Sequence, residues 1–237
     1  ANELAVMAHT QPGEQVILDE ACHIVCVEHG APARLAGVQT RTLPSDGGRM
    51  VLEDLEAVLV TNHVRTTLVC IENTHNYLGG RVLPLEYMRD LKTMLGEHGV
   101  RVHLDGARIT NASVKAGVPV ADYAACADSI MFCLSKGLCA PAGSLLCGGA
   151  EFIARARRMR DVFGGRLKQS GPLAECGIIA LTKMVDRLSE DHDLARRLYE
   201  GLRGLPNVTE TLELEEPETN MVFFTVKTMD GGEFLKR

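Results

Sequence analysis

Apolar positions along this chain follow two patterns, short continuous runs and longer stretches with helical spacing. The short runs are typical of buried strands and lie at residues 15–18, 38–43, 67–71, 100–104, 129–134 and 143–147. The helical spacing lies at residues 23–36, at residues 52–60, and in a stretch whose apolar stripe is Leu85, Met88, Leu91 and Leu95. This alternation predicts an α/β fold in which helices cover both faces of a mostly parallel sheet.

The pattern changes from residue 151 onward. Two long charged stretches with helical spacing occupy residues 151–162 and 172–204, and strand-like runs follow at 208–214 and 221–226. We therefore expect a large domain over residues 1–205 and the start of a small carboxyl-terminal domain over residues 206–237.

Two predicted strands end in residues with useful chemistry. Asp105 follows the run at 100–104, and Lys136 follows the run at 129–134. Open α/β sheets place their sites at strand carboxyl ends, so we expect these two side chains to lie close together. A lone aspartate after a strand is more often a helix cap, and a lone lysine is more often a surface charge. An amine beside a carboxylate is, however, the smallest set of side chains that pyridoxal phosphate chemistry requires.

The residues around this pair decide between those interpretations. Asp105-Gly106-Ala107-Arg108 and Ser135-Lys136-Gly137 resemble the cofactor motifs of the threonine aldolases. Further similar segments, in the order of that family, are residues 19–24, 72–76, 79–85, 103–108 and 134–141. The resemblance runs from near the first residue to about Leu202. It implies the PLP-dependent transferase fold (fold type I), with a seven-stranded type of sheet, and pyridoxal 5'-phosphate (PLP) as cofactor.

The resemblance also implies roles for residues around the cofactor. Lys136 would bind the cofactor aldehyde covalently, and Asp105 would keep the pyridine nitrogen protonated so that the ring accepts electrons. Arg108 would contact the phenolic oxygen of the cofactor, although a capping or surface charge is its alternative. His23 would stack on the cofactor ring, with a half-exposed capping histidine as the alternative.

A general base is also needed, because a hydroxyl proton must leave as the carbon–carbon bond breaks. His75 lies just past an apolar strand, and histidine is the side chain most often used as a general base, so it suits that task, either directly or through water. We therefore prefer His75 over His23 as the base. The remaining histidines lack such a context and are expected to be ordinary core or surface residues.

Some positions depart from the family pattern. The family carries a Gly-Thr turn that cradles the cofactor phosphate at a helix amino end, and the present sequence begins just past that pair. Asp161 stands where a base is usual, and Lys168 stands where an arginine is usual, with Arg166 nearby to compensate. Lys168 is thus the candidate phosphate ligand, with a weaker, single-point contact. No counterpart of the arginine that grips the substrate carboxylate is evident, so we expect this chain to be truncated and catalytically impaired.

Three functions remain open at this point. The family function is an aldehyde lyase that cleaves L-threonine or L-allo-threonine to glycine and acetaldehyde, in threonine catabolism and glycine biosynthesis. One alternative is a truncated, impaired relative that retains the fold. The other is a PLP-dependent beta-eliminating lyase, which would release ammonia and a keto acid instead of glycine and an aldehyde.

The amino-acid composition argues against several classes of binding partner. The chain of 237 residues is 46% hydrophobic with a net charge of −6 and no basic cluster, which argues against nucleic acid. No apolar run approaches a membrane span. The eight cysteines show no metal-binding spacing, so we expect reduced thiols, a cytoplasmic enzyme and no metal site. The expected partners are a small beta-hydroxy amino acid and further copies of the chain, as a homodimer or homotetramer with shared active sites.

Overall fold

The computed structural model describes residues 1–61, 63–210 and 216–236. In that part of the chain the central sheet has the strand order β2-β1-β5-β6-β7-β8. The strands are β1 (Gln15–Asp19), β2 (Gln39–Leu43), β5 (Thr66–Glu72), β6 (Arg101–Asp105), β7 (Ser129–Cys133) and β8 (Ser144–Gly148). Every pair is parallel except β7 and β8, which run antiparallel. The predicted α/β class with a mostly parallel sheet is confirmed.

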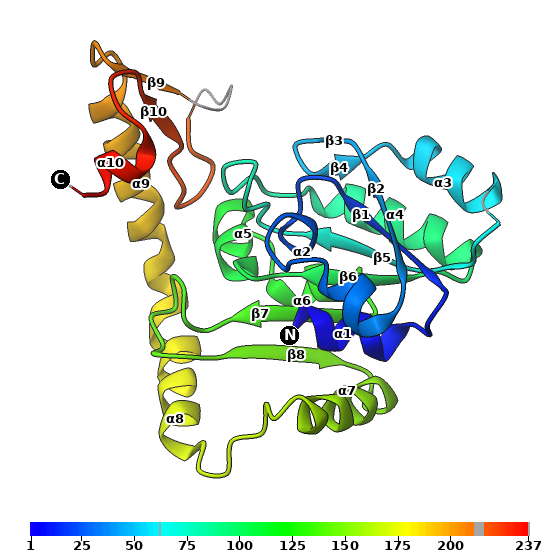
Figure 1. Cartoon of the computed structure of the whole chain (residues 1–237). Coiled ribbons are helices and arrows are strands. Elements are labelled where there is room, and N and C mark those ends of the chain that lie inside the picture. The colour runs from blue at the N-terminus through cyan, green and yellow to red at the C-terminus, as the bar shows by residue number, and fades with distance from the viewer. Residues whose placement is uncertain (62, 211–215, 237) are drawn as a thin grey trace.

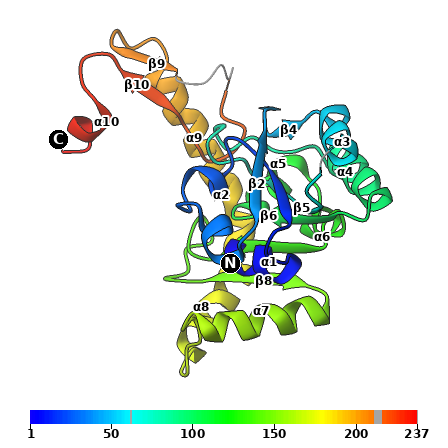
Figure 2. The ribbon, with the colours of Figure 1, turned by 45° about the vertical axis from the view of Figure 1, so that its right-hand side comes forward.

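Helices cover both faces of this sheet. Alternate side chains of a strand point to opposite faces, and accordingly Ile17 and Val69 join one core cluster while Val16 and Leu68 join another. The first cluster packs under α3 (Leu52–Thr61), α4 (Leu85–Glu97), α5 (Ile109–Ala116) and α6 (Val120–Ala125). The second packs under α1 (Asn2–His9). Figure 2 shows α2 (His23–Cys26) on the side of β1 and β5 opposite to α3 and α4.

The predicted apolar stripe of the helix after residue 84 is largely confirmed. In α4 the side chains of Met88, Leu91 and Leu95 are fully buried, and Leu85 packs half-buried against the same core. The helix begins directly after Pro84 and ends before the turn at Gly99, whose φ of 66° lies in the left-handed region.

The face of β6 and β7 that α1 covers is polar. Val102 and Leu104 point into the core under α4, so the alternation of strand side chains turns His103 and Asp105 toward α1. Ser129 of β7 faces the same way. The helix α7 (Ala150–Val162) packs beside α1. The sheet thus presents buried polar groups beneath α1.

The prediction of one helix over residues 23–36 is wrong. The structure has a single turn, α2, then an irregular segment, then a π-helical turn at Pro32–Ala36. His29 and Gly30 have φ values of 52° and 70°, which no right-handed helix accommodates. The apolar spacing continues through this break, which explains why the pattern suggested an unbroken helix.

The predicted helix over residues 172–204 is present but interrupted. It consists of α8 (Gly171–Ile179), a π-helical turn (Ala180–Met184), a 3-10 turn (Val185–Arg187) and α9 (Leu188–Leu202). Figure 1 shows α8 and α9 along one side of the sheet, with the carboxyl-terminal elements at the far end of α9. Among the described residues, no helix is both long and apolar enough to cross a membrane.

The carboxyl-terminal segment forms a separate small sheet. Strand β9 (Val208–Glu210) pairs antiparallel with β10 (Phe224–Val226), which is shorter than the predicted run at 221–226, and α10 (Gly231–Phe234) follows. The predicted strand at 208–214 extends beyond the described residues. The hairpin of β3 (Ser45–Asp46) and β4 (Arg49–Met50) was not predicted. The boundary at residue 205 stays a prediction.

Candidate active site

A cavity of about 290 Å³ opens where β5, β6 and β7 end. Its lining includes Asp105 from β6 and Lys136 from the turn after β7, the two groups that the sequence singled out. His23, also predicted, lines the same cavity. The structure therefore brings together the predicted amine, the predicted carboxylate and one predicted histidine.

Two hydrogen bonds hold the carboxyl group of Asp105 in the lining of this cavity. Its side chain is 3% exposed, and Oδ2 accepts a hydrogen bond of 2.7 Å from Asn2 Nδ2 while Oδ1 accepts one of 3.1 Å from the Ala107 N–H. Burial raises the pKa of Asp105 above its ordinary value, and the bond from Asn2 opposes that rise. Neutral donors on both oxygens thus fix the orientation of the carboxyl group.

Glu72 stands beside Asp105 on the neighbouring strand, because the parallel register pairs the two residues. Its Oε2 accepts from the His23 N–H at 2.7 Å, and its Oε1 accepts from the Asn76 N–H at 2.8 Å. Burial, with a further contribution from Asp105, raises the pKa of Glu72. Glu72 therefore ties together two loops at the cavity rim. The available signal was its place at a strand end, one strand away from Asp105.

His23 meets a carboxylate that the sequence did not single out. His23 Nδ1 lies 3.0 Å from Glu28 Oε1, and the same oxygen accepts a hydrogen bond of 2.8 Å from Asn2 Nδ2. Ligand atoms of His23, Glu28 and Asp105 lie within 4.8 Å of one another. Hydrogen bonds from Asn2 and His23 account for this proximity. Glu28 lies in the irregular segment that the sequence predicted as helix, so its position was not foreseeable.

Lys136 is half-buried beside Met131 and Cys133 in the cavity wall. With the residues that the structure describes, its Nζ forms no hydrogen bond or ion pair. A lysine at a cavity wall without a partner is available for a bound molecule. This is the arrangement that an amine nucleophile requires.

Arg108 contacts a residue of the cavity lining without being part of that lining. Its Nη1 donates a hydrogen bond of 2.8 Å to Asn76 Oδ1, and Asn76 itself lines the cavity. Burial lowers the pKa of Arg108 from its ordinary value. Arg108 thus supports the rim through Asn76, and its predicted contact with a cofactor oxygen stays a prediction.

His75 is fully buried and is not among the lining residues of the cavity. Its Nε2 lies 3.5 Å from Asp19 Oδ2, a distance that suits an ion pair and is long for a hydrogen bond. Burial raises the pKa of Asp19, but the contact with His75 and the hydrogen bonds from Ser45 and the Ala21 N–H outweigh it, and the net pKa is lowered. A Cβ on Gly48 would come within 2.8 Å of His75 Cδ2, so the imidazole is closely packed. Its role as base stays a prediction.

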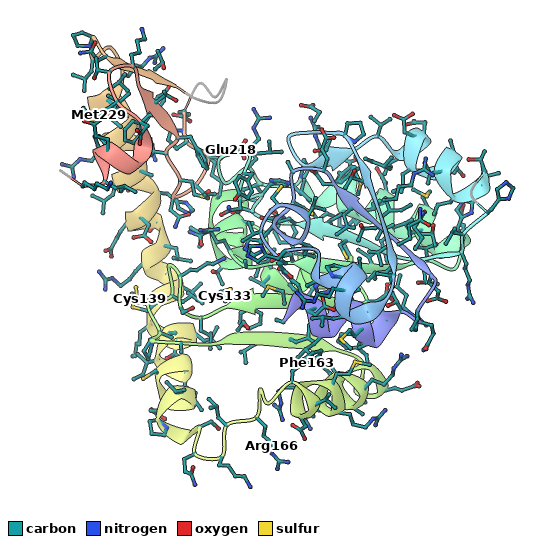
Figure 3. All side chains as sticks on the ribbon, viewed as in Figure 1. Cys133, Cys139, Phe163, Arg166, Glu218 and Met229 are labelled. Carbon is teal, nitrogen blue, oxygen red and sulfur yellow. The ribbon has the colours of Figure 1, made fainter. Side chains whose placement is uncertain are left out.

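Lys168 is not brought to the cavity. It lies exposed in the segment between α7 and α8, together with Arg166. Figure 3 shows Arg166 beyond α7, well separated from Cys133 at the end of β7. Arg166 Nη1 lies 3.5 Å from Asp161 Oδ2, and Arg160 Nη2 lies 3.4 Å from Asp161 Oδ1. Asp161 therefore forms ion pairs with both neighbouring arginines. The role of Lys168 in binding the cofactor phosphate stays a prediction.

Similarities to known proteins extend over almost the whole chain. The beta-eliminating lyase family model matches residues 1–229. Low-specificity L-threonine aldolase 1 of Arabidopsis thaliana is 38% identical over 98% of this chain. Low specificity L-threonine aldolase of Escherichia coli (strain K12) is 37% identical over 100% of this chain and 71% of its own length.

A solved structure shares the fold. The threonine aldolase of Leishmania major matches with a TM-score of 0.76 and 23% identity, over 89% of this chain and 63% of that one. The present chain spans 65% of the length of each of the two Arabidopsis thaliana relatives that it matches. The similarity in sequence to the first Arabidopsis thaliana relative and the similarity in fold to the Leishmania major structure thus extend over 98% and 89% of this chain.

Proposed function

This chain belongs to the beta-eliminating lyase family, and on that premise we propose that it forms the catalytic core of a PLP-dependent lyase. The proposed reaction cleaves L-threonine or L-allo-threonine to glycine and acetaldehyde, in threonine catabolism and glycine biosynthesis. The names of two relatives, both low-specificity L-threonine aldolases, support threonine as the substrate. The observation that carries the proposal is that Asp105 and Lys136 line one cavity.

The residues of this cavity fit PLP. The Lys136 amine has no partner among the described residues, which leaves it free to bind the cofactor aldehyde. When bound, PLP supplies an aromatic ring that takes up the electron pair of a breaking bond. The Asp105 carboxylate would hold a proton on the ring nitrogen, and the hydrogen bonds from Asn2 and Ala107 keep its oxygens oriented for this. His23 would offer its ring face to the cofactor.

The proton of the substrate hydroxyl needs an acceptor, and we assign this role to His75. Its contact with Asp19 orients the imidazole. Because the imidazole lies outside the cavity lining, the proton would pass to it through a water. Arg108, which donates a hydrogen bond to Asn76, would contact the phenolic oxygen of the cofactor.

The phosphate of the cofactor would be bound partly by Lys168 from another copy of the chain. Support comes from large apolar side chains left exposed on α8 and the following turn, where Ile178, Ile179 and Leu181 are 55%, 50% and 41% exposed. Such a patch is typical of a protein–protein interface. We therefore propose a homodimer or homotetramer with shared sites. The cytoplasmic location is proposed on the cysteine pattern of the sequence alone.

The product identity tests this proposal. The purified chain is mixed with PLP and L-threonine, and glycine and acetaldehyde are quantified alongside ammonia and keto acid. Glycine with acetaldehyde supports the aldolase. Ammonia with a keto acid would support the second candidate, a beta-eliminating lyase, which the family description favours. Cofactor binding without either product pair would identify a catalytically impaired relative.

A further inference from the structure

A series of contacts between buried polar side chains leads from the cavity to the carboxyl-terminal end of α1. Asn2 Nδ2 donates to Asp105 Oδ2 at 2.7 Å, and Asn2 Oδ1 lies 3.2 Å from His103 Nε2. His103 Nδ1 lies 2.8 Å from Ser129 Oγ, and the same Oγ lies 2.7 Å from His9 Nε2. His103, Ser129 and His9 have no role in the reaction proposed above, and Asn2 enters it only through its hydrogen bond to Asp105. All of them are buried.

Every hydrogen bond in this series of contacts has its donor on the side away from Asp105 and its acceptor on the side toward it. Asn2 Nδ2 also meets Glu28 Oε1 at 2.8 Å, and two carboxyl oxygens around one amide atom require it to be the NH2 group. Asn2 Oδ1 must then accept, so His103 carries its hydrogen on Nε2. His103 Nδ1 is consequently an acceptor, and Ser129 donates to it.

The far end completes the same direction. The Ser129 hydroxyl hydrogen is already used toward His103, so its oxygen accepts the Nε2 hydrogen of His9. The His9 ring stacks on Phe152 of α7, with ring centroids 4.4 Å apart and an angle of 21° between the planes. The chain of donors thus starts on a packed ring and ends on the cavity carboxylate.

Both imidazoles are suited to this arrangement because each must carry one hydrogen only. Burial lowers the pKa of His103 to about 3, and burial together with Arg101 lowers the pKa of His9 to about 4. Near neutral pH both rings are therefore neutral, with one donor and one acceptor nitrogen each. A protonated ring would present a second donor and break the sequence of contacts.

We propose that Asn2, His103, Ser129 and His9 are positioning residues that fix the tautomers and the amide orientation supplying Asp105 Oδ2 with its hydrogen bond. The purpose of this fixation rests on the proposed function, in which Asp105 pairs with the cofactor ring. The one-way order of donors stands without it. If these residues served only to fill space, no particular tautomer would be required.

The first experiment uses the chain without cofactor. Nitrogen-15 NMR of histidine-labelled protein at neutral pH is expected to show single Nε2–H tautomers for His103 and His9. Ser129→Ala is expected to give mixed tautomers at His9, which loses its partner on Nε2, and to leave His103 in the Nε2–H form that Asn2 requires. The matched control is Ser113→Ala, at a serine of α5 whose hydroxyl donates to the Val118 carbonyl, and it is expected to leave both rings unchanged. Nδ1–H tautomers in the unaltered chain, or no response to Ser129→Ala, would overturn the proposal.

The second experiment separates positioning from space filling. Asn2→Asp preserves the shape but places a third carboxyl against Asp105 and Glu28, whereas Asn2→Ala only removes the donor. We expect PLP, titrated by its absorbance, to bind about tenfold more weakly to Asn2→Ala and more weakly still to Asn2→Asp. The opposite order would overturn the proposal. Thermal unfolding of both variants verifies that they are folded.

Failure of the proposed function is distinguishable from failure of this inference. If the unaltered chain bound no PLP, the enzymatic proposal would fail, while the tautomers observed without cofactor would still decide whether the donor chain exists. If PLP bound and the tautomers were mixed, the donor chain would be refuted and the enzymatic proposal would stand.

Discussion

The cavity and the segment after α7 both carry charged residues, but the fold treats them in opposite ways. Asp105 and Glu72 are each 3% exposed, and each has a hydrogen-bond donor on both oxygens. Arg166 and Asp161, by contrast, form an ion pair of 3.5 Å with side chains that are 65% and 44% exposed. Sheet register and burial specify the cavity residues, whereas an exposed ion pair contributes little to the position of its members.

The largest effect that separates the two regions is expected at lysine. PLP is added and reduced with borohydride, which fixes it to the amine that it has bound. Lys136→Ala is expected to lose this label completely, because the cavity amine is gone, while Lys168→Ala is expected to retain labelling at Lys136. Peptide mass spectrometry locates the label. Labelling of Lys136→Ala at an unaltered level would remove Lys136 from the mechanism.

Histidine gives the next contrast, between a buried and a surface ring. If His75 accepts the hydroxyl proton, His75→Gln is expected to lower kcat on L-threonine by about 10² to 10⁴. The matched control is His98→Gln, since His98 Nε2 contacts Glu56 on the surface at 3.3 Å. Steady-state kinetics at saturating PLP measure both. A His75 variant with unchanged kcat would return the base role to His23.

The next largest effect on kcat is expected when the charge of Asp105 in the cavity is removed. Asp105→Asn is expected to lower kcat by about 10² to 10³, because the ring nitrogen loses the group that keeps it protonated. The exposed counterpart, Asp161→Asn, is expected to leave kcat within about twofold. Kinetics and PLP titration are run on both variants. Equal losses at both positions would mean that burial does not separate the two carboxylates in function.

A half-buried acid at the cavity gives a smaller effect on stability. Burial and the neighbouring Glu28 raise the pKa of Glu3 from 4.5 to about 7, and neither carboxyl oxygen has a hydrogen-bond partner. Between these values the unfolded chain loses the proton first, so this group lowers stability as the pH rises. Glu3→Gln is therefore expected to raise the free energy of unfolding at pH 8 by roughly 1 to 2 kcal/mol, allowing for solvent screening, and to have no effect at pH 4.

Urea unfolding at both pH values measures this, with the exposed Glu53→Gln as control. The buried imidazoles act with the opposite sign. The pKa of His103 is lowered from 6.5 to about 3, so its contribution to stability is complete above pH 6.5 and is lost as the pH falls through that window. Glu3→Gln and Glu53→Gln both retain His103, so the contribution of His103 cancels when their free energies of unfolding are compared. A Glu3→Gln effect that is the same at both pH values would show that Glu3 does not titrate in this range.

The sequence was informative wherever a local pattern determines position. Short apolar runs located the strands, and because parallel strands end together, Asp105 and Lys136 could be placed in one site. Glu28 and Asn2 could not. The left-handed backbone of His29 breaks the predicted helix and redirects Glu28, while the contact between Asn2 and Asp105 joins residues 103 positions apart. Contacts over such separations follow from packing rather than from periodicity.

The smallest expected effect concerns the acid that occupies the arginines after α7. If this segment meets a cofactor phosphate in an assembly, Asp161→Lys is expected to tighten PLP binding by about two- to fivefold, the size of an exposed charge interaction. The gain should shrink as salt is added, because exposed charges are screened. The control is Asp193→Lys, since Asp193 pairs with Arg196 at 2.8 Å on α9. An equal gain from both variants would indicate a general charge effect, and the segment would then be a surface feature only.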